Sequence, residues 1–198
     1  MHVLSVNSVL LILIVALAGG CSPENPTVII QTNRGEIVIE IYSKEAPLTA
    51  NNFITNCTNE VYRNSLFYRV VNQDNQENDS VKIDVIQGGL FEDSLIKNFP
   101  LIPHESTRFT RLKHLNGTVS MARLEPGTAS TEFFICIGDQ PELDFGGKRN
   151  PDGQGFAAFG KVIQGMDIVE QIHSLDVPDQ YLEKPVSITN IIVFSNLD

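Results

Sequence analysis

Short runs of strand-forming residues, separated by turn-forming residues, fill most of the chain after residue 26. In the run 36–42, Ile37, Ile39 and Ile41 alternate with two glutamates and a valine, which predicts a strand with one buried face. Strands are predicted over residues 27–32, 36–42, 66–71, 81–87, 118–122, 132–137, 156–163 and 186–194. So many short strands joined by turns indicate a mainly β fold, either a barrel or a sandwich.

Two stretches show helical spacing instead. Pro47 opens the first, and Thr49 is its expected N-cap. Its apolar positions are Ala50, Phe53, Ile54 and Cys57, and those of the second helix are Met166, Val169 and Ile172. Residues 33–35 carry a hairpin signal, and residues 72–80 form a loop without any apolar residue. The chain contains no internal repeat, and its length fits one domain.

The charge balance bears on the kind of partner. There are 24 Asp and Glu against 14 Lys and Arg, a net charge of −10, whereas nucleic-acid binding needs a basic surface. Nucleic acid is therefore excluded as a main partner. The three cysteines form no CxxC pair and the four histidines are scattered, so no metal site is expected. Cys57 and Cys136 form either a disulfide or two free core thiols, and both alternatives stay open.

The N-terminal segment has the pattern of an export signal. Residues 9–17 read VLLILIVAL, which is too short for a comfortable membrane span but suits the apolar part of a signal peptide. Small residues follow, and the sequence Ala-Gly-Gly-Cys ending at Cys21 resembles a bacterial lipobox. We therefore expect a signal peptide over residues 1–20, lipidation of Cys21 as the first mature residue, a tether over residues 21–26 and one domain over residues 27–198.

This pattern predicts a location. A lipid on Cys21 would anchor the protein in the bacterial cell envelope, facing the periplasm. The alternatives are a cleaved secretory signal, which would give a soluble periplasmic or secreted protein, and an uncleaved anchor.

Six segments occur in a recognisable order after residue 66. They are FYRVV (67–71), IQGG (86–89), GTVSMAR (117–123), EFFIC (132–136), LDF (143–145) and FGKVIQGMDIV (159–169). Together they resemble the cyclophilin family of peptidyl-prolyl cis-trans isomerases, in a divergent bacterial branch. The resemblance implies a closed eight-stranded antiparallel barrel capped by two α-helices. It also implies a monomer that needs no cofactor or metal and binds proline-containing protein segments.

The resemblance assigns roles to particular residues. Arg69 matches the catalytic arginine, Gln87 the glutamine that orients it, and Phe134 the aromatic floor of the proline pocket. Phe133 would then point the opposite way, into the core. Further substrate-binding positions are Tyr68, Val85, Ala122, Arg123, Glu132, Leu143 and Phe156. The implied reaction breaks no bond: a donor aimed at the prolyl nitrogen stabilises the twisted amide more than either planar isomer.

Several positions depart from the family pattern. Asp84 and Val85 replace a Phe-Met pair, Glu132 a glutamine, and Glu142 a frequent tryptophan; Tyr68 and Phe156 replace histidines. These changes predict a more acidic, less aromatic pocket. Glu132 is expected to pair with Arg69 and compete with substrate, so Glu132→Gln should raise kcat/KM. The alternative is that Glu132 holds Arg69 in its working rotamer.

Two function classes follow from these residues. The first is an isomerase that assists protein folding in the cell envelope, with activity lowered by the acidic pocket. The second is a cyclophilin-fold binding module or chaperone that holds proline-containing segments with little or no turnover.

Overall fold

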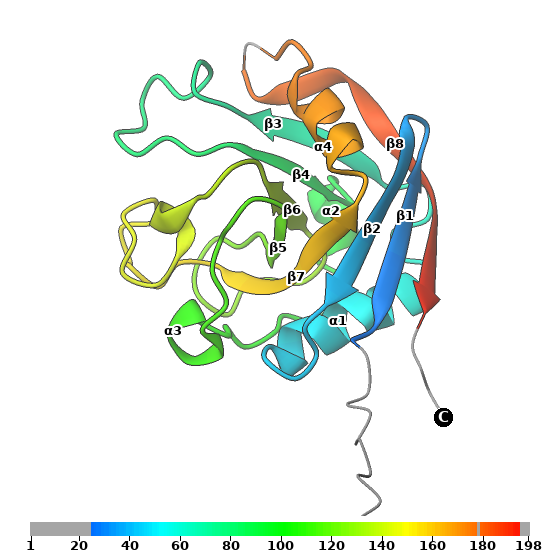
Figure 1. Cartoon of the computed structure of the whole chain (residues 1–198), viewed down its shortest axis with the longest axis horizontal. Helices are drawn as coiled ribbons and strands as arrows, with labels where there is room; N and C mark the ends of the chain where they lie inside the picture. The colour runs from blue at the N-terminus through cyan, green and yellow to red at the C-terminus, as the bar shows by residue number, and fades with distance from the viewer. Residues whose placement is uncertain (1–24, 178, 195–198) are drawn as a thin grey trace, which may run out of the picture.

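Eight antiparallel strands close into a barrel in the computed structural model, which describes residues 25–177 and 179–194 (Figure 1). The strands are β1 (Thr27–Thr32), β2 (Gly35–Ile41), β3 (Leu66–Val71), β4 (Val85–Gly89), β5 (Thr118–Met121), β6 (Phe133–Cys136), β7 (Ala157–Gln164) and β8 (Tyr181–Phe194). The helices are α1 (Pro47–Thr58), α2 (Asp93–Ile96), α3 (Thr107–Thr110) and α4 (Met166–His173), with a 3-10 turn at Pro141–Leu143. The predicted signal peptide and the lipidation of Cys21 lie outside the described residues.

The order of strands around the barrel is β1-β2-β7-β5-β6-β4-β3-β8, and β8 pairs with β1 to close the ring. This confirms the closed eight-stranded antiparallel barrel. Most strand boundaries lie within two residues of the prediction, but two differ by more. β4 begins at Val85 rather than at residue 81, and β8 begins at Tyr181 rather than at residue 186, where it pairs with Arg69 of β3.

Helices α1 and α4 cover opposite ends of the barrel (Figure 1). Helix α1 contacts β7 and β8, whereas α4 contacts β2, β3 and β4. The two four-residue helices α2 and α3 were not predicted, because so short a segment has no helical periodicity to detect. Among the described residues, no helix is long and apolar enough to cross a membrane.

The expected N-cap of α1 is wrong. Ala46 occupies that position without a side-chain hydrogen bond, and Thr49 lies buried inside the first turn. The carboxylate of Glu105, distant in sequence, accepts the backbone N–H of Leu48 (3.1 Å) and of Thr49 (2.6 Å). A remote side chain therefore satisfies the N–H groups that a local cap would have taken.

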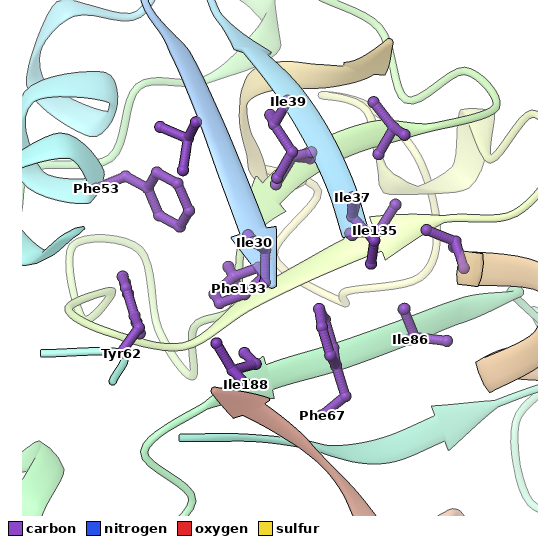
Figure 2. Packing of buried hydrophobic residues seen from close by; sticks show 14 of the residues in the cluster. Ile30, Ile37, Ile39, Phe53, Tyr62, Phe67, Ile86, Phe133, Ile135 and Ile188 are labelled. Atoms are coloured by element: carbon purple, nitrogen blue, oxygen red, sulfur yellow. The ribbon is translucent and has the colours of Figure 1, made fainter. Parts of the chain in front are cut away.

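The barrel interior is filled by isoleucines and aromatic rings (Figure 2). Ile37, Ile39 and Ile41 are fully buried, as their alternation predicted. Phe133 lies among other rings, with centroid separations of 5.3 Å to Phe53, 5.4 Å to Tyr62 and 5.7 Å to Phe67. Cys57 and Cys136 are buried free thiols, so the structure contains no disulfide between them. Through its three ring contacts, Phe133 joins α1, β3 and the segment before β3 in one core.

Candidate active site

A cavity of about 500 Å³ opens on the side of β3, β4 and β6 that faces away from the barrel core. The ten residues to which the sequence assigns a catalytic or substrate-binding role all line it: Tyr68, Arg69, Val85, Gln87, Ala122, Arg123, Glu132, Phe134, Leu143 and Phe156. The fold therefore brings together segments that are spread over nearly ninety positions of the sequence.

A β-bulge at Tyr68 shapes one wall of this cavity. Phe67 pairs with Gly88 and Arg69 with Gln87, so Tyr68 is an extra residue without a counterpart in β4. Simple alternation would place Tyr68 and Arg69 on opposite faces of β3, but a bulge puts neighbouring side chains on the same side. As a result both side chains line the cavity, while Phe67 and Val70 on either side remain in the barrel core.

An apolar slot forms one part of the cavity. It consists of Val71, Ile83, Val85, Phe134 and Leu143, with Ala122 and Phe156 packed against them. The rings of Phe134 and Phe156 meet edge to face at a centroid separation of 5.2 Å. Alternation along β6 places Phe133 in the core and Phe134 in this slot, as expected. The apolar lining of the slot suits a pyrrolidine ring.

The expectation of a more acidic, less aromatic pocket is met only in part. Among the described residues, Glu132 and Asp93 line the cavity, but Asp84 and Glu142 do not, and five aromatic rings line it as well. Asp84 lies between Ile83 and Val85 in an extended segment, so its side chain points the opposite way, where it accepts a hydrogen bond from Gln73. The sequence analysis missed Ile83, although the same alternation could have identified it as a partner of Val85.

Arg69 is held at the edge of the slot by two amide oxygens. Its Nη1 donates to Oε1 of Gln87 (2.9 Å), and its Nε (3.1 Å) and Nη2 (2.5 Å) donate to Oε1 of Gln180. Burial lowers the pKa of Arg69, but a guanidinium remains protonated in proteins. Gln180 was missed because it lies in a turn before β8 without any sequence pattern. It is fixed in turn, since its Nε2 donates to the carbonyl of Asn75 (2.9 Å).

Glu132 does not pair with Arg69, contrary to expectation. Its Oε2 accepts the Tyr68 hydroxyl (2.6 Å), and its Oε1 accepts the N–H of Leu90 (2.7 Å). The Tyr68 oxygen accepts Nε2 of Gln87 (2.6 Å), whose Oε1 faces Arg69. Two side chains therefore separate the carboxylate from the guanidinium, because Tyr68 at the bulge occupies the space between them. The ground for predicting competition between Glu132 and substrate disappears.

Arg123 lines the cavity, but its guanidinium is occupied. Nη1 and Nη2 bind the two carboxylate oxygens of Asp152 (2.8 and 3.0 Å), and Nε and Nη2 donate to the carbonyl of Gly155 (2.9 and 2.6 Å). Nη1 also donates to the carbonyl of Leu124 (3.0 Å). All five guanidinium N–H donors are thereby used. The side chain therefore fastens the loop of residues 144–156 beside the slot.

A buried polar group supports the floor of the slot. His114 lies behind Phe134 with nearly parallel rings, 6.0 Å between centroids. Its Nδ1 is 2.9 Å from Oδ1 of Asp144, and its Nε2 is 3.0 Å from Oγ of Ser120. Burial opposes ionisation of Asp144, but hydrogen bonds from His114 and Lys113 outweigh it and lower the carboxyl pKa. Ser120 is completely buried, so this arrangement is a support rather than a nucleophilic site.

A model of the family described as cyclophilin type peptidyl-prolyl cis-trans isomerase/CLD matches residues 27–193. The chain belongs to this family. As a cyclophilin it is a peptidyl-prolyl cis-trans isomerase. The described part of this cyclophilin contains no cluster of three or more side chains that could hold a metal ion.

Relatives of this cyclophilin are found among bacteria and eukaryotes. It is 32% identical over 165 residues to peptidyl-prolyl cis-trans isomerase B of Escherichia coli, which covers 83% of this chain and 94% of the relative. It is 35% identical over 149 residues to a peptidyl-prolyl cis-trans isomerase of Acinetobacter baylyi, covering 75% and 72% of the two chains. A crystal structure of a cyclophilin type isomerase of Cryptosporidium parvum matches with a TM-score of 0.68 at 21% identity, over 87% of this chain and 99% of the other. A structure of that protein in the presence of the dipeptide Ala-Pro matches with a TM-score of 0.67 at 22% identity, over 86% and 99% of the two chains. The last two likenesses concern the fold.

Proposed function

We propose that Arg69 drives isomerisation by donating to the nitrogen of a twisted X-Pro amide whose ring lies in the apolar slot. The planar amide presents a barrier of about 18–20 kcal/mol because its C–N bond has partial double-bond character. Twisting breaks that conjugation and returns a lone pair to the nitrogen. A hydrogen bond to this lone pair forms in the twisted state and not in the planar ones, so it lowers the barrier.

The number of unoccupied donors on Arg69 carries this proposal. Gln87 and Gln180 take three of its N–H groups among the described residues, and a guanidinium has five. The two that remain belong to a side chain that lines the same cavity as Phe134 and Leu143. The guanidinium is also held rigidly, so little reorganisation is needed when the amide twists. The structure of the Cryptosporidium protein in the presence of the dipeptide Ala-Pro is consistent with a proline-containing substrate.

Replacement of Arg69 tests the mechanism. Arg69→Ala should lower kcat/KM at least about tenfold, which corresponds to about 1.4 kcal/mol of transition-state stabilisation. The assay would follow cis-to-trans conversion of a short proline peptide with a protease that cleaves the trans form. Arg63→Ala is a matched control, because Arg63 is exposed and pairs with Glu60 on the surface.

Two results would contradict the proposal. Wild-type activity in a folded Arg69→Ala protein would remove Arg69 from the mechanism. A wild-type protein that binds proline peptides without accelerating isomerisation would favour the alternative, a binding module or chaperone with little turnover.

We further propose that the protein acts in the bacterial cell envelope, on segments of proteins that fold there, and is held by a lipid on Cys21. The apolar run 9–17 and the Ala-Gly-Gly-Cys sequence after it support this location. Metabolic labelling with a palmitate analogue should mark the protein, and Cys21→Ser should abolish the label. An unlabelled wild-type protein free in the periplasm would contradict the anchor and favour a cleaved secretory signal.

A further inference from the structure

We propose that Glu132 is a positioning residue for the reaction: through the Tyr68 hydroxyl, its carboxylate fixes the side-chain amide of Gln87 with the oxygen toward Arg69. This inference rests on the proposed role of Arg69. It concerns the part of the cavity around Arg69 and Gln87 rather than the slot for the proline ring.

The contacts form one continuous chain with a single direction. Arg69 Nη1 donates to Oε1 of Gln87 (2.9 Å), Gln87 Nε2 donates to the Tyr68 oxygen (2.6 Å), and the Tyr68 hydroxyl donates to Oε2 of Glu132 (2.6 Å). Every step runs from a donor to an acceptor, beginning at the cation and ending at the anion. The two 2.6 Å distances are at the short end for hydrogen bonds.

The direction of this chain depends on the charge of Glu132. An ionised carboxylate can only accept, so the single proton of the Tyr68 hydroxyl must point toward it. The hydroxyl oxygen then presents its lone pairs to Gln87, so the NH₂ group of Gln87 must donate to it. The carbonyl end of the Gln87 amide is thereby turned toward Arg69. A neutral group at position 132 would let the hydroxyl proton turn to Gln87, and the amide could then flip and present N–H to the guanidinium.

The local structure holds the carboxylate at the start of this chain. Oε1 of Glu132 accepts the N–H of Leu90 (2.7 Å) and the hydroxyl of Thr131 (3.2 Å). Gly89 makes room for it, because a side chain there would collide with the Glu132 carboxyl group. The Tyr68 ring is fixed as well, packing on Phe91 at a centroid separation of 4.7 Å. The carboxylate is therefore placed by contacts that do not involve Arg69.

A pH dependence follows from this arrangement. Burial raises the pKa of Glu132, although the hydrogen bonds from Tyr68 and Leu90 oppose the shift. Because the ionised form is the one that orders Gln87, kcat should hold above this pKa and fall as the pH drops through it. The other ionisable groups that face Glu132 or line the cavity are Tyr62, Tyr68, Arg69, Asp93, Arg123, Arg149 and Tyr181. Burial raises the pKa values of Tyr62 and Tyr68, and the arginines stay charged. Asp93 is the other carboxyl group in the cavity, so it is the group to control.

Two substitutions test the inference. Glu132→Gln keeps the shape and removes the charge, and Tyr68→Phe keeps the ring and removes the hydroxyl. Each should lower kcat roughly three- to tenfold with KM changed less than about twofold. The double variant should be no worse than either single one, because both break the same chain. Glu183→Gln, an exposed carboxylate on β8, is the matched control for loss of charge.

The fall of kcat at acidic pH, the acid limb of the profile, distinguishes a positioning role from a merely structural one. If Glu132 were only structural, its replacement would leave the shape of the kcat–pH profile unchanged. Wild type and Asp93→Asn should both lose kcat as the pH falls, whereas Glu132→Gln should show no such limb. In NMR spectra, the Gln87 side-chain amide should titrate with Glu132 in wild type and stay constant in Glu132→Gln. If Glu132→Gln does not fold, the same comparison applies to Tyr68→Phe.

The outcomes separate this inference from the proposed function. A Glu132→Gln protein with wild-type or higher kcat and an unchanged acid limb would overturn the positioning role, even if Arg69→Ala is inactive. A fully active Arg69→Ala protein would instead overturn the mechanism on which the inference rests.

Discussion

Three arginines line the cavity, Arg69, Arg123 and Arg149, and the number of free N–H donors separates the roles of the first two. All five N–H groups of Arg123 are bound to Asp152, Gly155 and Leu124. Within the part of the chain that the structure describes, Arg69 retains two, because Gln87 and Gln180 accept only three of its five N–H groups. Neutral acceptors fix the guanidinium without cancelling its charge, whereas the carboxylate of Asp152 neutralises Arg123. The presence of an arginine in a pocket is thus weaker evidence of its role than the number of its N–H donors that remain free.

Gln180 should support catalysis by fixing the Arg69 guanidinium. Gln180→Ala removes the acceptor of Nε and Nη2 while Gln87 still holds Nη1, so Arg69 should become partly mobile. We expect kcat to fall about three- to tenfold with little change in KM, since loss of one hydrogen-bond partner typically costs about 1 kcal/mol. The measurement is the protease-coupled peptide assay.

Gln171→Ala on α4 serves as the control, because Gln171 is an exposed glutamine outside the cavity. Unchanged kcat in Gln180→Ala would show that Gln87 alone suffices to hold Arg69.

At the scale of elements, two long loops form the outer wall of the apolar slot. The polar loop before β4 is held by Gln76, which is buried and pairs with both backbone groups of Ile83. Arg149 joins it to the loop before β7 by contacting Asp79 (3.1 Å) and the carbonyl of Val81 (2.7 Å). The loop between β3 and β4 is therefore held in place and contributes Ile83 to the cavity.

Glu105 should stabilise helix α1 from a distance in the sequence. Glu105→Ala removes the carboxylate that accepts the N–H groups of Leu48 and Thr49. The free energy of unfolding should fall by about 1 kcal/mol, as for loss of an ordinary N-cap. Urea denaturation followed by circular dichroism measures it.

Glu45→Ala is the matched control, since Glu45 lies just before α1 but does not bond its first-turn N–H groups. Equal losses in the two variants would mean that general attraction to the positive end of the helix, rather than capping by Glu105, stabilises α1.

Over the whole molecule, sequence patterns predicted those features that depend on residues close together in the chain. Alternation located the buried face of β2 and separated Phe133 from Phe134, and the ordered motifs identified the barrel and the cavity residues. The contacts of Gln180, Arg149 and Glu105 could not be predicted, because their partners lie dozens of residues away along loops of irregular path. The bulge at Tyr68 was missed for a related reason, since it appears only when β3 is paired with β4.

The pairing of β1 with β8 has a consequence for biosynthesis. Thr27 lies opposite Phe194, so the first strand to leave the ribosome waits for the last before the ring can be sealed. Until then β1 and β3 each lack a neighbour, and unpaired strands are prone to join other chains. Folding that awaits such distant partners is also slow, in the range of about milliseconds to seconds. The newly made chain of this isomerase must therefore be kept apart from other unfolded chains until its own barrel has closed.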